Sequence, residues 1–493
     1  MIKVGNTVLK KQKNFWNACV FHPTDAVEDP WGRRILDRMS EDGAIHTVRI
    51  YSMFEDIVYL DENNKLCYDF RISDLRLDYL IEKGYDLLIS YAGMPDCIAS
   101  TCSNKTSVSK NKTRYKGKMW NSAPPKDYKL WEDICYEYTK HNVERYGIET
   151  VSSWKIQCFN ESDAHLFFLS EYPKEDWKSR LDAYCKLYES FEKGIRRVSD
   201  DISIGGPALA MYYEFFDGFL AYVKENNLKI DFVSTHNYST SPRRLREKIK
   251  PISISSIINH HEQIVKSICK YGFSELPVLM DEWGMSSGGF CNKEECPDLM
   301  IRESEAFSAY FVRLIRKLLD SKCTPESLMI CLSGQHEMVE DFSGFRNFFT
   351  LNFIKKPIYN AFVLASKLKD KLLLADTEFE DLSIIPTKDD NGSYAVMLSY
   401  VNDTCEENLP DICETITFEE NIVGKCVSVW CIDKNTTNPY RTWQAEGSPE
   451  MDEAILIKLR EEGTLKKSTS FIAENNSVPL VLTANSTFLI TIE

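Results

Sequence analysis

The sequence contains no apolar run long enough to cross a bilayer, and its first dozen residues lack the apolar stretch of a secretory signal. We therefore expect a cytosolic protein without a membrane partner. The chain also lacks an excess of positive charge, because its formal net charge is −15 at pH 7 and its pI is near 5.2. Nucleic acids and acidic membranes repel a net anion, so neither is an expected partner.

The sixteen cysteines lack the spacing of common metal and redox motifs. The two pairs that could form such a site, Cys97 with Cys102 and Cys291 with Cys296, are five positions apart, whereas zinc knuckles and thioredoxin motifs leave a gap of two residues. Many other cysteines lie within apolar runs, as Cys19 does, which is typical of reduced core residues in a cytosolic protein. We expect no metal, and a metal at either pair remains the alternative.

The first three quarters of the chain alternate short apolar runs with longer segments of helical period. The predicted strands cover residues 16–22, 46–50, 86–90, 154–158, 202–206, 230–235, 277–282 and 328–333. The predicted helices lie near residues 31–42, 71–83, 126–146, 177–198, 213–226, 254–271, 301–319 and 357–370. Eight strands, each followed by a helix, predict an α/β fold in the form of a (β/α)8 TIM barrel. No glycine-rich phosphate loop follows the first strand, which argues against a dinucleotide-binding fold.

Near residue 372 the sequence pattern changes to short runs of alternating apolar and polar residues, broken by Asn, Asp, Gly and Pro. This pattern is typical of an antiparallel β-sandwich. These runs cover residues 393–400, 422–430, 454–459 and 488–492. A chain of 493 residues exceeds one usual domain. We expect a catalytic barrel over residues 14–371 and a β-sandwich over 372–493, with residues 1–13 as a strand added to the sandwich. The polar stretch 103–118 predicts a long surface loop.

Two glutamates stand where barrel strands end. Glu161 follows the fourth predicted strand and Glu282 ends the seventh, so both are expected at the C-terminal mouth of the barrel, facing each other. An acidic residue at that end of a buried strand is poorly placed for a structural role. Two carboxyl groups across such a mouth can cleave a glycosidic bond as acid and nucleophile. We therefore interpret Glu161 and Glu282 as a catalytic pair.

Several polar and aromatic residues are expected around this pair. Asn160 can hydrogen-bond a sugar hydroxyl, and Trp283 would offer an aromatic wall to the substrate. His236 and Tyr238 follow the sixth predicted strand and should converge on the same mouth. For His236 a purely structural role is equally open.

Short motifs spread over the barrel point to one known family. They include Val48-Arg49-Ile50, Tyr68-Asp69-Phe70, Pro124-Pro125-Lys126-Asp127-Tyr128, Arg145-Tyr146-Gly147-Ile148-Glu149, Asn160-Glu161, Gly205-Gly206-Pro207-Ala208, Asp231 to His236, Glu282-Trp283 and Lys356-Pro357. With these motifs the sequence resembles glycoside hydrolase family 39, the β-xylosidase-like family of the large clan of retaining (β/α)8 glycosidases. Family relatives carry a β-sandwich after the barrel, built partly from the N-terminal strand.

The resemblance assigns roles to residues of the mouth. It implies that Glu161 is the acid/base and Glu282 the nucleophile, that Asn160 contacts the sugar 2-hydroxyl, and that His236 and Tyr238 line the site around the nucleophile. It implies a retaining exo-glycosidase that releases a sugar from small glycosides or oligosaccharides. This mechanism needs no metal or organic cofactor.

Three departures from the family pattern concern the sugar pocket. The chain has Phe159-Asn160-Glu161-Ser162 where xylosidases typically read Trp-Asn-Glu-Pro, and Tyr51-Ser52 in place of a His-Gly whose His helps to hold the sugar. The segment ending in His336-Glu337 differs too much to carry a role. Activity on β-galactosides or α-L-arabinosides, and a catalytically degenerate carbohydrate-binding barrel, therefore stay open as alternatives. Assembly into a homo-oligomer also stays open.

Overall fold

The eight predicted strands close into one parallel barrel. The computed structural model describes residues 2–101, 105–107, 119–333 and 337–493. The strands follow the order β10-β11-β12-β13-β2-β3-β6-β9 around the barrel, which confirms the predicted fold class. They are β2 (Ala18–Phe21), β3 (Thr47–Tyr51), β6 (Asp86–Tyr91), β9 (Lys155–Cys158), β10 (Ser203–Leu209), β11 (Phe232–Thr240), β12 (Val278–Ser286) and β13 (Ser327–Leu332).

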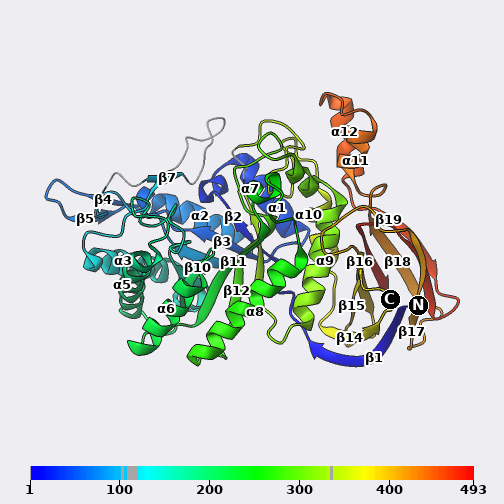
Figure 1. Cartoon of the computed structure of the whole chain (residues 1–493), viewed down its shortest axis with the longest axis horizontal. Helices are drawn as coiled ribbons and strands as arrows, with labels where there is room; N and C mark the ends of the chain where they lie inside the picture. Colours follow the sequence, from blue (N-terminus) through cyan, green and yellow to red (C-terminus); the bar gives the residue numbers. More distant parts are fainter. Residues whose placement is uncertain (1, 102–104, 108–118, 334–336) are drawn as a thin grey trace.

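Helices cover the outside of the barrel (Figure 1). They are α1 (Pro30–Glu41), α2 (Arg71–Glu82), α3 (Tyr128–Tyr146), α4 (Ile148–Ser153), α5 (Trp177–Arg196), α6 (Tyr213–Glu225), α7 (Pro242–Arg246), α8 (Ile254–Tyr271), α9 (Glu305–Asp320) and α10 (Pro357–Ala365). Their start sites are chemically marked, because Asp29, Asp127 and Ser304 each accept a backbone hydrogen bond from the first turn of α1, α3 and α9. Among the described residues, no helix is both long and apolar enough to cross a membrane.

The connections at the mouth of the barrel carry small elements of their own. They are the 3-10 helices η1 (Thr24–Val27), η2 (Phe54–Asp56) and η3 (Pro297–Glu303), and the strand pairs β4 (Val58–Leu60) with β5 (Leu66–Tyr68) and β7 (Lys105–Ser107) with β8 (Met119–Asn121). Most of the predicted loop 103–118 lies outside the described residues, and β7 falls within it.

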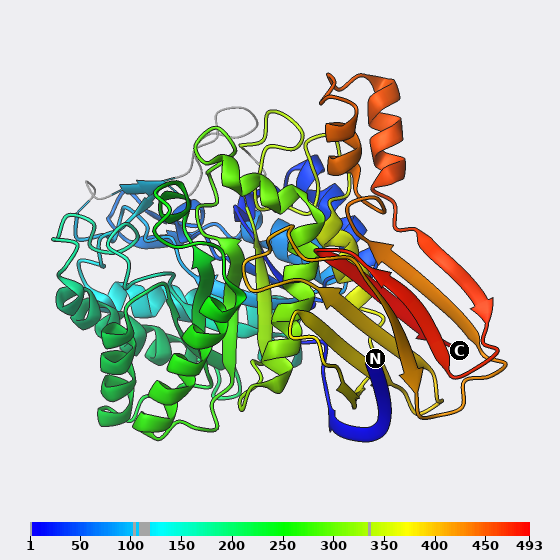
Figure 2. The same ribbon diagram turned by 45° about the vertical axis from the view of Figure 1, so that its right-hand side comes forward.

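A nine-stranded sheet follows the barrel, in the order β19-β18-β21-β16-β15-β14-β1-β17-β20. Strand β1 (Ile2–Lys11) joins it from the other end of the chain, antiparallel to β14 (Lys371–Asp376) and parallel to β17 (Ile412–Phe418). The remaining strands are β15 (Leu382–Lys388), β16 (Tyr394–Tyr400), β18 (Cys426–Ile432), β19 (Lys467–Ile472), β20 (Ser477–Leu482) and β21 (Ser486–Ile492). Both chain termini lie at this sheet (Figure 2). The exact division at residues 14–371 and 372–493 stays a prediction.

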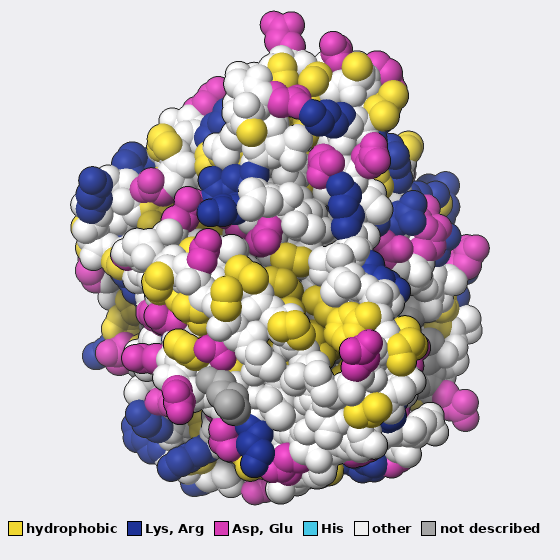
Figure 3. All heavy atoms as spheres, turned by 90° about the vertical axis from the view of Figure 1, so that its right-hand side faces the viewer, with side chains coloured by type: hydrophobic (Ala, Val, Ile, Leu, Met, Phe, Trp, Pro, Cys, Tyr) yellow, Lys and Arg dark blue, Asp and Glu magenta, His cyan; other side chains and the backbone are white. Residues whose placement is uncertain are grey.

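Helix α9 lies between the barrel and this sheet and contacts β15, β16 and β21 (Figure 1). Its two sides therefore both face packed structure, and thirteen of its sixteen residues are buried. Figure 3 views the molecule from the side on which the C-terminal sheet lies. On this face, acidic and basic side chains are interspersed around a group of hydrophobic ones. Charge of one sign is thus not gathered on this face.

One predicted strand is a helix. The run 454–459 lies within α12 (Glu453–Glu462), which with α11 (Pro439–Ala445) projects from the sheet (Figure 1). Leu456 and Leu459 are three positions apart and pack on one side against Phe342, so the helical period outweighs the apparent alternation. The side chain of Asp452 accepts a hydrogen bond from the backbone N–H of Ile455 and marks the helix start.

A buried ion pair fixes the loop that follows β13 over the barrel. The Lys356 ammonium lies 2.7 Å from Glu303 Oε1 and also donates to the carbonyl of Phe345. The same Glu303 oxygen accepts the backbone N–H of Gly344. Residues 344–356 are thereby tied to the end of η3.

Replacing Lys356 by Met should therefore leave the Glu303 carboxylate buried without its counter-charge. We expect the free energy of unfolding to fall by about 3–5 kcal/mol, measured by chemical denaturation at neutral pH. Lys466→Met is the matched control, because Lys466 pairs with Glu462 on the partly exposed surface of α12. It should cost about 0–1 kcal/mol. Equal losses in the two variants would contradict a structural role of the buried pair.

Candidate active site

Glu161 and Glu282 meet at the mouth of the barrel together with His236. One carboxylate oxygen of each glutamate and a ring nitrogen of His236 lie within 4.8 Å of one another. His236 Nδ1 is 2.7 Å from Glu161 Oε1 and 3.7 Å from Glu282 Oε2. Such close spacing is that of retaining glycosidases, whose carboxyl groups are about 5–5.5 Å apart, and leaves no room for a water between an inverting pair. In the part of the chain that the structure describes, this is the one cluster of three potential metal ligands.

A β-bulge in β12 aims the Glu282 side chain. In the pairing of β12 with β11, Thr235 faces Met280 but His236 faces Glu282, so Asp281 is an extra residue on β12. Because of this extra residue, Asp281 and Glu282 both point into the barrel although they are adjacent in the chain.

Glu282 is held as a carboxylate by three donors. Arg49 Nη1 donates to Oε1 at 2.9 Å, Tyr238 Oη donates to Oε2 at 2.6 Å, and Tyr51 Oη lies 3.3 Å from Oε1. Burial alone would raise the pKa of Glu282, but the charges of His236, Arg49 and Arg346 outweigh it and lower the pKa below its usual range. Glu282 is therefore ionised at neutral pH.

Glu161 differs from Glu282 in its backbone conformation and in the direction in which its pKa is shifted. Its backbone adopts φ +47°, a left-handed conformation that a non-glycine residue rarely takes, and its N–H donates to the carbonyl of Ala208. Burial raises the pKa of the carboxyl group, and the neighbouring charge of His236 offsets this only in part. The two glutamates thus have pKa values pushed apart, which is the condition for one to act as an acid while the other is an anion.

His236 lies between the two glutamates as a cation. Burial would lower its pKa, but the negative charges of Glu282 and Asp281, and that of Glu161 when it is ionised, raise it to about 10. The protonated ring donates its Nδ1–H to Glu161 and places Nε2 at 3.5 Å from Asp281. His236 is therefore part of the site and not a separate core residue.

Arg49, with Gln157 and Asp281 beside it, belongs to the site although the sequence assigned none of the three a role. Its fully buried guanidinium donates to Glu282, to Asn160 Oδ1 at 2.7 Å and to Gln157 Oε1 at 2.8 Å, and lies 3.3 Å from Asp281. Gln157 in turn donates to Asp281 Oδ2 at 2.6 Å. A signal was present in Val48-Arg49-Ile50, because a charge in the middle of an apolar strand needs a buried partner.

Tyr51 and Asn160 lie where the sequence predicts them, beside Glu282. Tyr51 is buried, its hydroxyl is 3.3 Å from Asn160 Oδ1, and its ring meets that of His22 edge to face at 5.5 Å. Burial raises the pKa of Tyr51, so the phenol stays protonated and can donate. His336, to which the sequence assigned no role, lies outside the described residues.

Trp283 is not an aromatic wall of the mouth, and that prediction is wrong. Its side chain is fully buried and stacks on Phe311 of α9 at 5.8 Å between ring centres. Successive residues of a strand point to opposite sides, so once Glu282 faces the interior Trp283 must face the helices. Its indole supports β12 from behind.

Comparison with known proteins places these features in a family context. The family model described as glycosyl hydrolases family 39 matches residues 2–472. A β-xylosidase of Caldicellulosiruptor saccharolyticus is 26% identical over 95% of this chain and 93% of its own length, and one of Geobacillus stearothermophilus is 24% identical over 80% and 73%. The fold is similar to that of a monomeric β-xylosidase from Caulobacter crescentus CB15, with a TM-score of 0.83, 18% identity, and coverage of 100% of this chain and 99% of that one.

The Arg49 contacts predict a coupled change in stability and ionisation. In Arg49→Met, Asp281 and Glu282 would remain buried side by side without the guanidinium, so we expect a loss of about 3–5 kcal/mol in the free energy of unfolding at neutral pH. In the native protein the lowered pKa of Glu282 means that this group stabilises the fold at neutral pH, and that the contribution is lost as the pH falls through the folded pKa. The difference in the free energy of unfolding between the native protein and Arg49→Met should therefore be smallest in acid.

Denaturation curves at neutral and acid pH measure both effects. Arg71→Met is the control, because Arg71 is an exposed arginine paired with Asp69, and its loss should leave the stability nearly unchanged at either pH. An Arg49→Met variant as stable as the control at neutral pH would show that Arg49 does not neutralise the buried carboxylates.

Proposed function

Since the chain belongs to glycosyl hydrolases family 39, whose members are retaining glycosidases, we propose that Glu282 is its nucleophile and Glu161 its acid/base. The observation that carries this proposal is the geometry of the pair, two carboxyl groups within 4.8 Å whose pKa values are shifted in opposite directions. A retaining double displacement requires this spacing and this difference in ionisation.

The reaction then has two steps. In the first, Glu282 attacks the anomeric carbon, the bond to the leaving oxygen breaks, and the proton of Glu161 passes to that oxygen. In the second, the Glu161 carboxylate takes a proton from water, the water oxygen attacks the anomeric carbon, and the bond to Glu282 breaks. Each carboxyl group ends in the protonation state in which it began, and the sugar keeps its anomeric configuration.

Neighbouring residues support these steps in the proposal. Arg49 and Tyr238 keep Glu282 ionised and fix both of its oxygens. Arg49 also donates a hydrogen bond to the amide oxygen of Asn160. The amide N–H groups of Asn160 are then left to bind the sugar 2-hydroxyl. The His236 cation orients Glu161 and favours its return to the carboxylate form after the proton is transferred.

For the substrate, we propose a β-xyloside or a closely related small glycoside or oligosaccharide, cleaved from the non-reducing end. The β-xylosidases among the similar proteins support the class. Tyr51 lies beside Glu282 and supports a sugar whose hydroxyl pattern differs from that of xylose. β-Galactosides and α-L-arabinosides are therefore the alternative substrates. A degenerate binding barrel is less favoured, because a pure binding site has no need of two carboxyl groups with opposed pKa shifts. A cytosolic location and a homo-oligomer also remain proposals.

Alanine variants should separate the roles of the two acids. Glu282→Ala should lose nearly all turnover while keeping its fold, because no covalent intermediate can form. Glu161→Ala should lose about 10²–10⁴-fold on substrates with poor leaving groups, much less on activated aryl glycosides, and should be accelerated by azide, which replaces the activated water. Rates are measured with an aryl-glycoside panel. Wild-type rates for Glu161→Ala on all substrates would refute its role.

The pH profile of kcat/KM should report both groups. Activity should fall in acid as Glu282 gains a proton. Because the pKa of Glu282 is lowered, this fall should occur at a pH below the usual pKa range of carboxyl groups. It should fall again as the pH rises through the raised pKa of Glu161, because the acid is then lost. Tyr238→Phe removes a donor to Glu282 and should move the acid limb to higher pH, leaving the alkaline limb in place. A shift of the alkaline limb alone would reverse the assignment.

Tyr51 should set the sugar preference. A phenol presents one donor on a rigid arm, whereas the histidine of typical xylosidases presents two ring nitrogens nearer the backbone. We expect Tyr51→His to raise catalytic efficiency on an aryl β-xyloside relative to an aryl β-galactoside and an aryl α-L-arabinoside. A native enzyme that strongly prefers the β-xyloside, with no change in Tyr51→His, would show that Tyr51 does not discriminate.

A further inference from the structure

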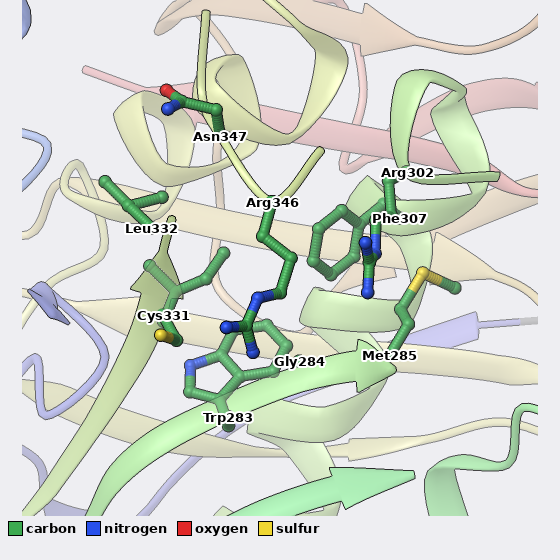
Figure 4. A pocket seen from close by; sticks show the side chains of 10 residues that line it. Trp283, Gly284, Met285, Arg302, Phe307, Cys331, Leu332, Arg346 and Asn347 are labelled. Atoms are coloured by element: carbon green, nitrogen blue, oxygen red, sulfur yellow. The ribbon is translucent and has the colours of Figure 1, made fainter. Parts of the chain in front are cut away.

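The two glutamates of the active site are supported in different ways. Glu282 belongs to β12, and behind this strand the Arg346 guanidinium extends toward the indole of Trp283 (Figure 4). Glu161 lies instead in the loop of residues 159–176, which joins β9 to α5. A loop positions a side chain less precisely than a strand of a closed barrel does, so Glu161 needs a support of its own.

One hydrogen bond joins this loop to the end of β10, and the backbone is strained on both sides of it. The N–H of Glu161 donates to the carbonyl of Ala208 at 3.2 Å, and the two residues have φ angles of +47° and +53°. Residues other than glycine keep a left-handed conformation only where the surrounding structure determines it. The segment that follows Ala208 must therefore be fixed for Glu161 to stay in place.

Asp163, two residues after Glu161, fixes that segment. Its side chain is fully buried. Its Oδ1 accepts the backbone N–H of Ala210 at 2.9 Å, and its Oδ2 accepts those of Met211 and Tyr212 at 2.7 Å and 3.0 Å. The loop that carries Glu161 and the loop that follows β10 are thus joined twice, by the backbone of Glu161 and by the carboxylate of Asp163.

Arg180 holds the same loop from the other side. Its fully buried guanidinium donates to three backbone carbonyls, those of Asp163 at 3.0 Å, Pro173 at 3.3 Å and Lys174 at 2.7 Å. Arg180 belongs to α5, which covers the outside of the barrel. Asp163 is therefore tied to a helix through its own carbonyl and to the next loop through its carboxylate, and both contacts hold the backbone next to Glu161.

We propose that Asp163 is the positioning residue of the acid/base and holds Glu161 where its proton reaches the leaving oxygen. This inference rests on the role proposed for Glu161 above. Asp163 neither contacts the sugar nor exchanges a proton in it, because both of its oxygens are buried and accept backbone N–H groups. Loss of Asp163 should therefore impair protonation of the leaving group, and leave the attack of Glu282 on the anomeric carbon intact.

The dependence of kcat/KM on the leaving group tests this inference. The full chain is assayed on aryl glycosides of the sugar that the native protein prefers, with leaving phenols that range from strongly to weakly acidic. Asp163→Asn keeps the size of the side chain but offers one acceptor oxygen to three N–H donors. Asp176→Asn is the matched control, because Asp176 lies in the same loop and also accepts a backbone N–H, that of Ser179, but at the start of α5.

We expect Asp163→Asn to lose about 10–10²-fold in kcat/KM on glycosides of weakly acidic phenols, because a misplaced acid protonates them poorly. It should lose little on glycosides of strongly acidic phenols, which leave without a proton. Asp176→Asn should follow the native protein on every substrate. If Asp163→Asn lacks the native near-ultraviolet circular dichroism, Arg180→Lys takes its place with the same expectation, since lysine keeps the charge but lacks the planar fork that reaches three carbonyls.

Glu161→Ala, assayed on the same series, separates this inference from the proposed function. It should show the same preference for good leaving groups, only more strongly. If it does, an Asp163→Asn variant that loses activity equally on all leaving groups, or that matches Asp176→Asn, would overturn the role of Asp163 alone. If Glu161→Ala itself loses activity equally on all leaving groups, the acid/base assignment is wrong and the inference on Asp163 falls with it.

Discussion

The arrangement of the site depends on one buried interaction, the contact of the Arg49 guanidinium with Glu282, Asp281, Asn160 and Gln157. Asp281 and Glu282 are adjacent in the chain and both point into the barrel, where two uncompensated carboxylates would be very costly. Arg49 comes from β3, across the barrel from β12, so only a closed barrel brings the three charges together. The fold and the ionisation of Glu282 are therefore linked.

The barrel wall holds these groups from the outside as well. Trp283 and the rings of α9 pack behind the bulge in β12, and α9 is itself enclosed by the C-terminal sheet. On the opposite side of the mouth, Glu161 is held in a left-handed backbone conformation by its hydrogen bond to Ala208. A strained residue of this kind persists only where the surrounding structure determines it, and such residues cluster at functional sites. The C-terminal sheet thus contributes to the rigidity of the site without contacting it.

Sequence reasoning located the barrel strands because each is a short apolar run followed by a segment of helical period, and all eight appear in the structure. It also placed Glu161, Glu282, His236 and Tyr238 at one mouth, since side chains at strand ends of a parallel barrel converge. It failed for Trp283, because strand alternation turns the residue after an inward-facing Glu282 toward the helices. The bulge at Asp281, which lets both Asp281 and Glu282 face the interior, leaves no mark in the sequence. Residues 454–459 show apparent alternation, and only their packing on Phe342 reveals a helix. The Arg49 contacts required knowledge of which strands lie opposite each other.

The most direct test of the central claim is to identify the residue that becomes covalently attached to the sugar. A 2-deoxy-2-fluoro glycoside with a good leaving group slows both steps but the second more, so the glycosyl-enzyme accumulates and can be digested and sequenced by mass spectrometry. We expect a single labelled peptide containing Met280-Asp281-Glu282-Trp283, with the sugar on Glu282. A label on Glu161 or Asp281, or inactivation without any covalent label, would contradict it.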